Sequence, residues 1–365
     1  MEKKPKFAVI GAGHGGLAMA GHLAIMGFSV NIYNRSKEKL WSIMETGGIR
    51  IESDFGLEGF GKINLATSDI GEAIEGVDII MVVVPATAQK SIATIMAPHL
   101  KDGQIVVLNP GRTFGALEFK QVLNSLNIST NVIIAEAQTF IYASRSTGPA
   151  QAKIFRIKNS IPIASIRAHL IPEVLKKLRI AFPQFVPGDN IFKTSLDNIG
   201  AVFHPTICVL NAGWIEDDSD FQFYIQGVTP SVARVLEKVD EERVKVAAAL
   251  GIRALTAREW LYLAYSASGE SLYDAMRANP GYRGILAPNR LNMRYLTEDV
   301  PASLVPIASI GEKFQVEIPY IKSIIQLASV MNQTDYWSIG RTVQSLNIEH
   351  LSLRELRLLA IGEKL

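Results

Sequence analysis

Short apolar runs alternate with helical segments over the first half of the chain. Runs rich in β-branched residues predict strands over residues 8–10, 30–33, 79–84, 105–108 and 132–135. The run 79–84 is apolar at every position, which is typical of a strand covered by helices on both faces. This alternation predicts an α/β protein whose N-terminal part is a doubly wound parallel sheet, the Rossmann arrangement.

The second half of the chain carries helical rather than strand periodicity. Residues 182–190 are rich in turn formers and are expected to be a linker. Thr229 and Pro230 form a helix start signal, and an amphipathic helix over 231–250 then ends at Gly251. Further helices are predicted at 257–265, 271–277, 319–331 and 352–361. We therefore expect a dinucleotide-binding domain at 1–185 and a mainly α-helical domain at 190–365.

A glycine-rich turn follows the first predicted strand and precedes an apolar helical segment. Gly11 permits the tight turn, Gly13 leaves room for backbone to approach a pyrophosphate, and Gly16 lets the helix pack on the strand. His14 and Gly15 lie within the same turn. The context of strand, glycines and helix predicts a dinucleotide site with the phosphates at the helix N-terminus.

The end of the second predicted strand bears on the choice of cofactor. Sites specific for NAD commonly have a carboxylate there, whereas this chain has Asn34, Arg35 and Ser36. A guanidinium beside two small polar side chains suits a 2′-phosphate, which favours NADP over NAD. Three alternatives stay open. Arg35 is a solvated loop residue, Lys37 or Lys39 supplies the charge instead, or the protein uses both cofactors.

Two turns at the ends of later strands are also expected to flank the cofactor. Pro85 and Ala86 end the run 79–84, and Asn109 begins a turn of sequence Asn-Pro-Gly after the run 105–108. Ligands of such sheets lie beyond the carboxyl ends of the strands. The same residues are equally compatible with plain turns.

Composition narrows the class of partner. The 365 residues are 48% hydrophobic with a formal net charge of +2, and no basic or membrane-spanning stretch stands out. We expect small-molecule partners, no nucleic acid and no membrane. The single cysteine, Cys208, excludes an intrachain disulfide and a cysteine cluster, so no metal site is predicted and a cytoplasmic location is expected. The N-terminus runs into a strand rather than a secretory signal.

His204 is the histidine whose context suits proton transfer. It lies in an apolar stretch, residues 196–205, just past the expected linker, and is expected to line a cleft between the domains. An imidazole titrates near neutral pH and can act as a general acid or base. A histidine on an apolar helix is, by itself, more often a packed core residue. The remaining histidines lie in the glycine turn or in expected helix surfaces and loops: His14, His22, His99, His169 and His350.

A second polar group lies near the C-terminal third. Arg294 has the chemistry to bind a carboxylate, and Asp299 has the chemistry to orient an imidazole and stabilise its protonated form. The sequence does not show that His204 and Asp299 meet. A surface salt bridge for Arg294 and a helix cap for Asp299 remain the simpler interpretations.

Several short motifs in fixed order resemble the opine dehydrogenase family over nearly the whole chain. The family includes octopine and nopaline dehydrogenases, and the pattern is nearest to N-(1-carboxyethyl)norvaline dehydrogenase. The motifs are Gly15-Gly16, Val84-Pro85-Ala86, Asn109-Pro110-Gly111, Gly115-Ala116-Leu117-Glu118-Phe119, Thr194-Ser195-Leu196 through His204-Pro205, Gly227-Val228-Thr229-Pro230-Ser231-Val232 and Arg294-Tyr295 with Glu298-Asp299-Val300.

The resemblance implies reductive condensation of an amino acid amine with a 2-oxo acid such as pyruvate, with hydride supplied by NADPH or NADH. It implies that His204 is the catalytic histidine and Asp299 its partner. It also implies, less strongly, that Arg294 binds a carboxylate and that Asn198 is a polar neighbour of the histidine. Tyr224 is expected to shape the substrate pocket, unless it is simply core. The near relative has an acidic residue at the end of its second strand, so its cofactor choice does not transfer to Asn34 and Arg35.

Two other functions stay open, and a homodimer is expected by analogy alone. A 2-oxo acid reductase of the ketopantoate reductase type shares the two-domain plan but uses a lysine proton donor, for which Lys193 is the nearby candidate. A sensor that holds NADP without turning it over is the other possibility, because a fold does not guarantee chemistry.

Overall fold

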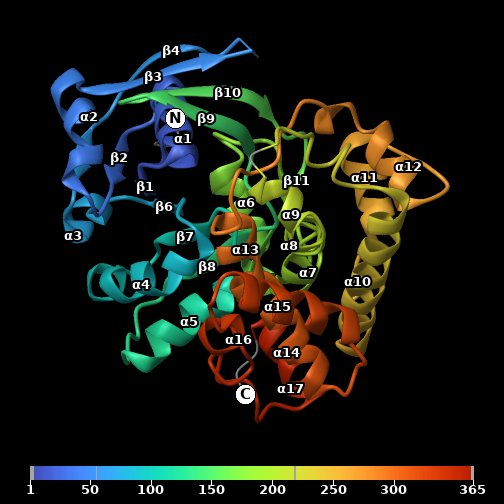
Figure 1. Ribbon diagram of the computed structural model, residues 1–365. Coiled ribbons are helices and arrows are strands. Elements are labelled where there is room, and N and C mark those ends of the chain that lie inside the picture. The colour runs from blue at the N-terminus through green and yellow to red at the C-terminus, as the bar shows by residue number, and fades with distance from the viewer. Residues whose placement is uncertain (1–3, 55, 218, 363–365) are drawn as a thin grey trace. The chain divides into compact units, whose positions relative to one another are not determined.

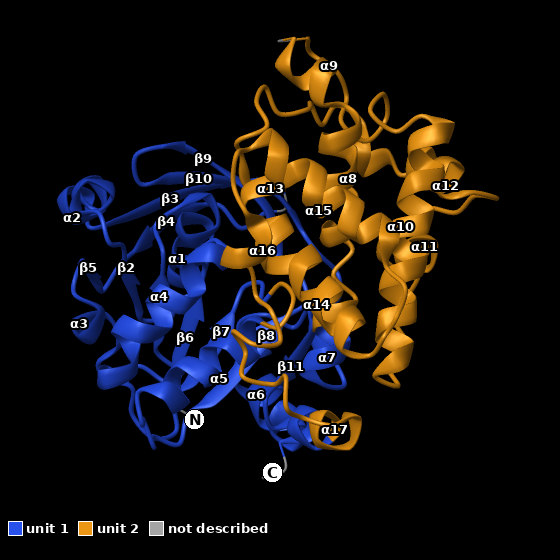
Figure 2. Ribbon diagram, turned by 60° about the horizontal axis from the view of Figure 1, so that its bottom comes forward, with its two compact units in different colours: residues 1–111, 115–194, 358–365 blue, residues 112–114, 195–357 orange. Residues whose placement is uncertain are grey.

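A computed structural model describes residues 4–54, 56–217 and 219–362 (Figure 1). The chain folds into two compact units, coloured separately in Figure 2. Unit 1 takes its residues from 1–111, 115–194 and 358–365, and unit 2 takes its residues from 112–114 and 195–357. Among the described residues, no helix combines the length and the apolar character that crossing a membrane requires.

Unit 1 is built on an eight-stranded sheet of order β12-β11-β8-β7-β6-β1-β2-β5. All neighbouring strands are parallel except β8 and β11, which are antiparallel. The chain order reverses between β1 and β6, as in a doubly wound sheet, so the predicted fold class is confirmed. The strands are β1 Phe7–Ile10, β2 Val30–Tyr33, β5 Leu65–Thr67, β6 Ile79–Val82, β7 Ile105–Leu108, β8 Ile133–Ala137, β11 Ile161–Ser165 and β12 Phe185–Pro187.

Burial explains why the central strands were visible in the sequence. Every residue of β1, β2, β6 and β7 is buried, which requires an apolar run rather than alternation. The predicted strand 79–84 is two residues too long, because β6 ends at Val82. The helices of the unit are α1 His14–Ile25, η1 Lys37–Lys39, α2 Trp41–Thr46, α3 Ile70–Ile74, α4 Ala86–Met96, η2 Ala97–His99, α5 Gly115–Ser125, η3 Ala168–Leu170 and α6 Ile171–Leu178.

Unit 1 also contains a four-stranded sheet that the sequence did not predict. Its order is β4-β3-β10-β9, with strands β3 Gly48–Ser53, β4 Gly59–Lys62, β9 Tyr142–Gly148 and β10 Gln151–Ile157. Buried and exposed positions alternate along β3 and β9, so one face lies in the core and the other is solvated. The sheet packs on α1. Half-exposed segments that contain glycine and charged residues lack a continuous apolar run and carry a weak strand signal.

The prediction of a linker at residues 182–190 was wrong. Residues Phe185–Pro187 form β12, which pairs with β11 in parallel, and Phe185 is fully buried. Pro183 precedes this short edge strand, Pro187 is its last residue, and Gly188 follows it. By packing, the division between the units falls inside α7, Ile191–Leu196, after Thr194. The domain ranges 1–185 and 190–365 stay predictions.

Unit 2 is mainly helical, as predicted. Its longest helix is α10, Pro230–Ala249, where the Thr229 hydroxyl accepts from the Val232 N–H and Pro230 occupies the first turn. The other elements are α8 Gly200–Leu210, α9 Ala212–Glu216, α11 Ala257–Tyr265, α12 Leu272–Ala278, η4 Pro280–Tyr282, α13 Arg294–Thr297, the π-helix η5 Val300–Leu304, α14 Val305–Lys313, α15 Pro319–Met331 and α16 Tyr336–Ile339; α17, Leu353–Ile361, crosses into unit 1.

Candidate active site

The glycine turn has the shape that a pyrophosphate needs. Gly11 has a φ of +114°, and a Cβ there would collide with the Val83 carbonyl oxygen. A Cβ on Gly16 would collide with the carbonyl of Gly11, so the helix approaches the strand closely. A Cβ on Gly13 would meet nothing within 4 Å, and no side chain caps the N-terminus of α1. The turn therefore leaves open space beside uncapped helix N–H groups, which fits a dinucleotide phosphate.

His14 and Gly15 are fixed against unit 1 itself. The exposed His14 ring accepts a hydrogen bond at Nδ1 from the Ser146 N–H, at 3.0 Å. A Cβ on Gly15 would approach the Phe140 ring to 2.8 Å. Both contacts tie the turn to the segment around β9.

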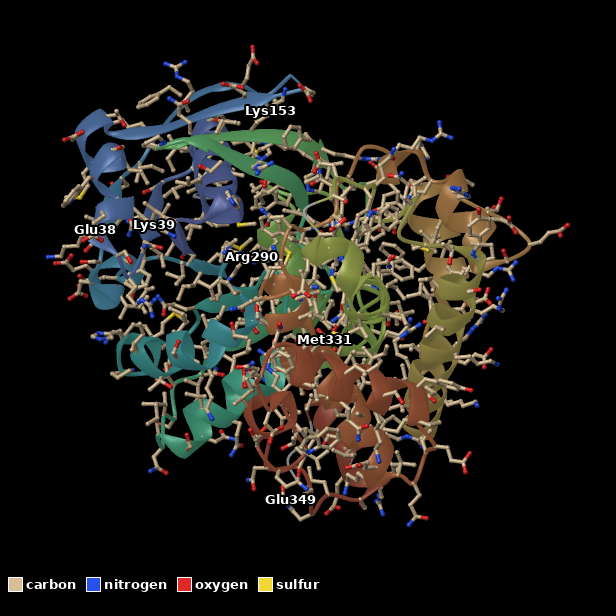
Figure 3. All side chains as sticks on the ribbon, viewed as in Figure 1. Glu38, Lys39, Lys153, Arg290, Met331 and Glu349 are labelled. Carbon is tan, nitrogen blue, oxygen red and sulfur yellow. The ribbon has the colours of Figure 1, made fainter. Side chains whose placement is uncertain are left out.

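Asn34 is a structural link between β2 and the glycine turn. Its Oδ1 accepts from the Ala12 N–H at 3.1 Å, and its Nδ2 donates to the Ser36 carbonyl at 3.1 Å. Arg35 is exposed beside it, and Ser36 is half-buried. Figure 3 shows Glu38 and Lys39, the exposed residues that follow in η1. Arg35 is thus a surface cation at the end of β2.

The residues predicted to flank the cofactor at the ends of β6 and β7 lie in the loops after these strands and at the start of α4. Pro85 is the exposed residue before α4, and Ala86 is its first, buried residue. Asn109 follows β7 and is buried, with Nδ2 donating to the Val107 carbonyl at 2.9 Å. Its Oδ1 is buried without a hydrogen-bond partner among the described residues.

Unit 2 brings His204 and Asp299 together, although they lie 95 residues apart in the chain. His204 Nδ1 is 2.7 Å from Asp299 Oδ2, and the Asp299 side chain is 0% exposed. The buried helix α8 presents the imidazole, and Asp299 directly precedes the π-helix η5. Asp299 occupies the N-cap position of η5, but its side chain makes no capping hydrogen bond there. A π-helix within a helical region is frequent at functional sites.

The second ring nitrogen of His204 faces a phenol. Nε2 lies 2.9 Å from the Tyr224 hydroxyl, and the Tyr295 ring stacks on the imidazole with centroids 4.3 Å apart. Because Nδ1 faces a carboxylate, we assign the proton of the neutral ring to Nδ1, which leaves Nε2 to accept from Tyr224. Burial raises the pKa of Tyr224 well above its usual value, so its hydroxyl remains a donor.

Arg112 is the residue of this group that the sequence reasoning missed. Its Nη1 lies 3.1 Å from Asp299 Oδ1, and its Nε donates to Glu298 Oε1 at 3.2 Å. The contact with Oδ1 is an ion pair without hydrogen-bond alignment. Burial pushes the pKa of Asp299 upward, but Arg112 and His204 outweigh it, so the pKa lies below the usual value. Nothing local in the sequence marks Arg112, which meets Glu298 across 186 residues.

Arg294 and Asn198 lie close by with other partners. Arg294 Nη2 pairs with Glu298 Oε2 at 3.1 Å, the salt bridge left open as an alternative, while its side chain remains 60% exposed. Asn198 is buried and donates from Nδ2 to the Ser303 hydroxyl in η5 at 2.9 Å. Its amide nitrogen thus binds the π-helix rather than the imidazole.

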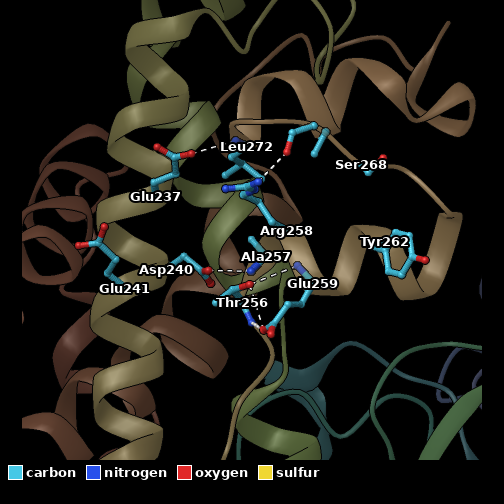
Figure 4. A pocket seen from close by; sticks show the side chains of 12 residues that line it. Glu237, Asp240, Glu241, Thr256, Ala257, Arg258, Glu259, Tyr262, Ser268 and Leu272 are labelled. Carbon is cyan, nitrogen blue, oxygen red and sulfur yellow. Dashed lines mark hydrogen bonds between the residues drawn. The ribbon is translucent and has the colours of Figure 1, made fainter.

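A separate cavity of about 540 Å³ lies between α10, α11 and α12 (Figure 4). Glu237 accepts from the Leu272 N–H, and Asp240 accepts from the Ala257 N–H, so these carboxylates support the fold. None of the residues predicted for the active site lines this cavity.

Comparison with known proteins identifies the family of the chain. Residues 187–332 match the family described as NAD/NADP octopine/nopaline dehydrogenase, alpha-helical domain, and residues 6–113 match the NAD binding domain of 6-phosphogluconate dehydrogenase. An opine dehydrogenase of Arthrobacter sp. (strain 1C) is 37% identical over 98% of this chain and 99% of its own length. Protein ocs of Agrobacterium tumefaciens (strain Ach5) is 30% identical over 94% and 96%.

Among solved structures, an octopine dehydrogenase with NADH and L-arginine has a TM-score of 0.83. It covers 99% of both chains at 20% identity, and at that identity the likeness shows the fold.

Proposed function

We propose how this chain, which belongs to the opine dehydrogenase family, divides its reaction among the residues described above. It is an NAD(P)-dependent oxidoreductase acting on CH–NH bonds, and it condenses an amino acid with a 2-oxo acid such as pyruvate. The 2.7 Å contact between His204 and Asp299 is the observation that carries our assignment of the acid–base group. His204 acts in proton transfer, and Asp299 orients and stabilises it.

The reaction requires protons to be moved at two points. The amine must lose a proton to attack the oxo carbon, and the resulting hydroxyl must gain one to leave as water. Nε2 of His204 serves both steps, because Nδ1 donates to Asp299 and stays fixed. A reduced nicotinamide, when bound, supplies the hydride that converts the imine into the secondary amine. Asp299 stabilises the imidazolium that forms between the two proton transfers.

For the cofactor we propose NADP, held at the glycine turn and at Asn34, Arg35 and Ser36. The Asn34 side chain is engaged in holding the turn, which leaves the exposed Arg35 guanidinium to pair with a 2′-phosphate. The Arg35→Ala variant should raise the KM for NADPH by roughly 10- to 150-fold and leave the KM for NADH nearly unchanged, since a charge-assisted hydrogen bond contributes about 1.5–3 kcal/mol. Equal KM values for NADPH in both proteins would contradict the assignment.

For the substrates we propose that Arg294 binds a carboxylate and that Tyr224 contacts the reacting groups. Arg294 is exposed, although one oxygen of Glu298 already pairs with it. Tyr224 donates to the same Nε2 that must exchange protons, so its hydroxyl has to yield to the substrate or pass the proton on. Asn198 supports the site through η5 rather than by direct contact with the ring.

The decisive experiment is NADPH oxidation with pyruvate, measured with and without a panel of amino acids. Our proposal expects turnover that depends on the amine, loss of turnover in His204→Ala, and nearly unchanged NADPH affinity in that variant. Turnover on the oxo acid alone, sensitive to Lys193 rather than His204, would instead support a simple 2-oxo acid reductase. NADPH binding without any turnover would support a sensor. The homodimer and the cytoplasmic location stay predictions.

A further inference from the structure

A three-residue segment from the loop after β7 packs as part of unit 2. Arg112 and Phe114 have φ values of 58° and 62°, a left-handed conformation that is unfavourable for residues with a Cβ. The segment is held because the Thr113 N–H donates to the Ala302 carbonyl at 3.2 Å and the Phe114 N–H donates to Ser195 Oγ at 2.9 Å. Such conformations persist only where the surroundings fix them, and they cluster at functional sites.

The conformation places the Arg112 guanidinium between two consecutive buried carboxylates. Glu298 is 5% exposed and Asp299 is 0% exposed, while Arg112 is 11% exposed. Glu298 shares its oxygens, with Oε1 on Arg112 and Oε2 on Arg294. An ionic chain therefore runs from the exposed Arg294 through Glu298, Arg112 and Asp299 to His204.

We propose that Arg112 is a positioning residue, which holds the Asp299 carboxylate ionised and directed at Nδ1 of His204. It acts through Asp299 and does not bind the substrate carboxylate. This inference rests on the proposed function of His204.

The surroundings of Asp299 make this role necessary. Burial disfavours its charged form, and an opposite charge in contact favours it. Among the residues that the structure describes, Arg112 is the one arginine or lysine within ion-pair distance of Asp299. The titratable and charged groups that face Asp299 are Arg112 from the 112–114 segment, His204 and Cys208 from α8, Tyr224 from the loop after α9, and Arg294 and Tyr295 from α13. Without Arg112, the one positive charge in contact with Asp299 would be that of a histidine, which must itself gain and lose its proton.

The contacts of Arg112 also separate its role from that of Arg294. Nε and Nη1 of Arg112 already face protein carboxylates, and its side chain is largely buried. Arg294 is the exposed arginine of the pair. Loss of Arg112 should therefore lower kcat, whereas loss of Arg294 should raise the KM for the oxo acid.

The test compares Arg112→Gln and Arg112→Lys with the wild-type enzyme in amine-dependent NADPH oxidation over a range of pH. For Arg112→Gln we expect kcat to fall on the order of 10- to 100-fold, within the contribution of general acid–base catalysis. The acid limb of its pH profile should move to higher pH, because an unpaired buried carboxyl holds its proton more tightly. The KM for pyruvate should change less than about twofold. Arg112→Lys should recover part of kcat, since an ammonium retains the charge but faces one carboxylate at a time.

Arg234→Gln is the matched control, because this exposed arginine on α10 bonds only to Ser231 among the described residues. NADPH titration and thermal unfolding establish whether each variant is folded. If Arg112→Gln does not fold, the test passes to Arg112→Lys, which must then show the reduced kcat and the shifted acid limb. Wild-type kcat and pH profile in the folded variants, or a raised KM with kcat intact, would overturn the inference. An inactive wild-type enzyme would contradict the proposed function. An active wild-type enzyme in which substitution of Arg112 has no effect would contradict only the positioning role of Arg112.

Discussion

Replacement of Asp299 by asparagine tests the geometry on which the assigned chemistry depends. The change is nearly isosteric and removes the charge that lies 2.7 Å from His204 Nδ1 and 3.1 Å from Arg112 Nη1. An asparagine amide can donate to Nδ1, which would place the imidazole proton on Nε2 and block its role as a base. We expect kcat to fall on the order of 10²- to 10⁴-fold, which corresponds to about 3–5 kcal/mol in the barrier.

The same variant should lose stability, because Arg112 would keep only one of its two carboxylates. Breaking a buried ion pair costs about 3–5 kcal/mol, and the remaining contact with Glu298 should hold the loss in the free energy of unfolding to roughly 1–3 kcal/mol. The pKa of Asp299 is lower in the folded protein than in the unfolded chain. Its stabilisation is therefore present above the unfolded pKa of about 4 and is lost as the pH falls through the folded value. Asp299→Asn should lack this acid-dependent loss.

The assay combines initial rates of amine-dependent NADPH oxidation with NADPH fluorescence titration and urea unfolding. Asp54→Asn is the control, because it removes the same charge from an exposed ion pair with Lys153 in unit 1. This control should keep wild-type rates and stability. An Asp299→Asn enzyme that retains more than about a tenth of the wild-type kcat would refute the reasoning from tautomer and charge.

Four further substitutions probe the glycine turn and the fold of the two units. Gly13→Ala should leave thermal unfolding unchanged, because a Cβ there meets nothing within 4 Å. It should weaken NADPH binding at least about tenfold if a pyrophosphate lies there. Gly16→Ala should reduce both stability and NADPH binding, because its Cβ collides with Gly11. His22 is buried, and burial lowers its pKa to about 4. Between about pH 6.5 and pH 4 the unfolded chain therefore binds a proton that the folded protein does not bind. As the pH is lowered through this range, the free energy of unfolding decreases by at most about 1.4 kcal/mol per pH unit. His22→Asn should flatten that slope in urea titrations, and an unchanged slope would contradict it. Thr229→Ala should cost about 1 kcal/mol of stability through loss of the α10 cap, and an effect below about 0.3 kcal/mol would argue against the cap.

The sequence predicted the elements whose signals are local. Central strands such as β6 and β7 are apolar throughout because both faces are covered, and α15 matches the predicted range 319–331. The second sheet was missed because its strands are half-exposed and carry no continuous apolar run, and His22 was assigned to a surface although it is buried against Tyr142. Each of these errors concerns a residue whose environment is supplied by a distant part of the chain.

By itself, the sequence determined the Rossmann turn, the helical character of the second half and, through resemblance, the pair His204 and Asp299. Strand runs, glycine turns and helix caps depend on neighbours a few residues away, so they can be read along the chain. Only the tertiary structure decided that Arg112 joins that pair and that Asn34 holds the glycine turn. The ionisation of Asp299 depends on its burial and on charges brought from segments far apart in the chain, and folding alone creates both.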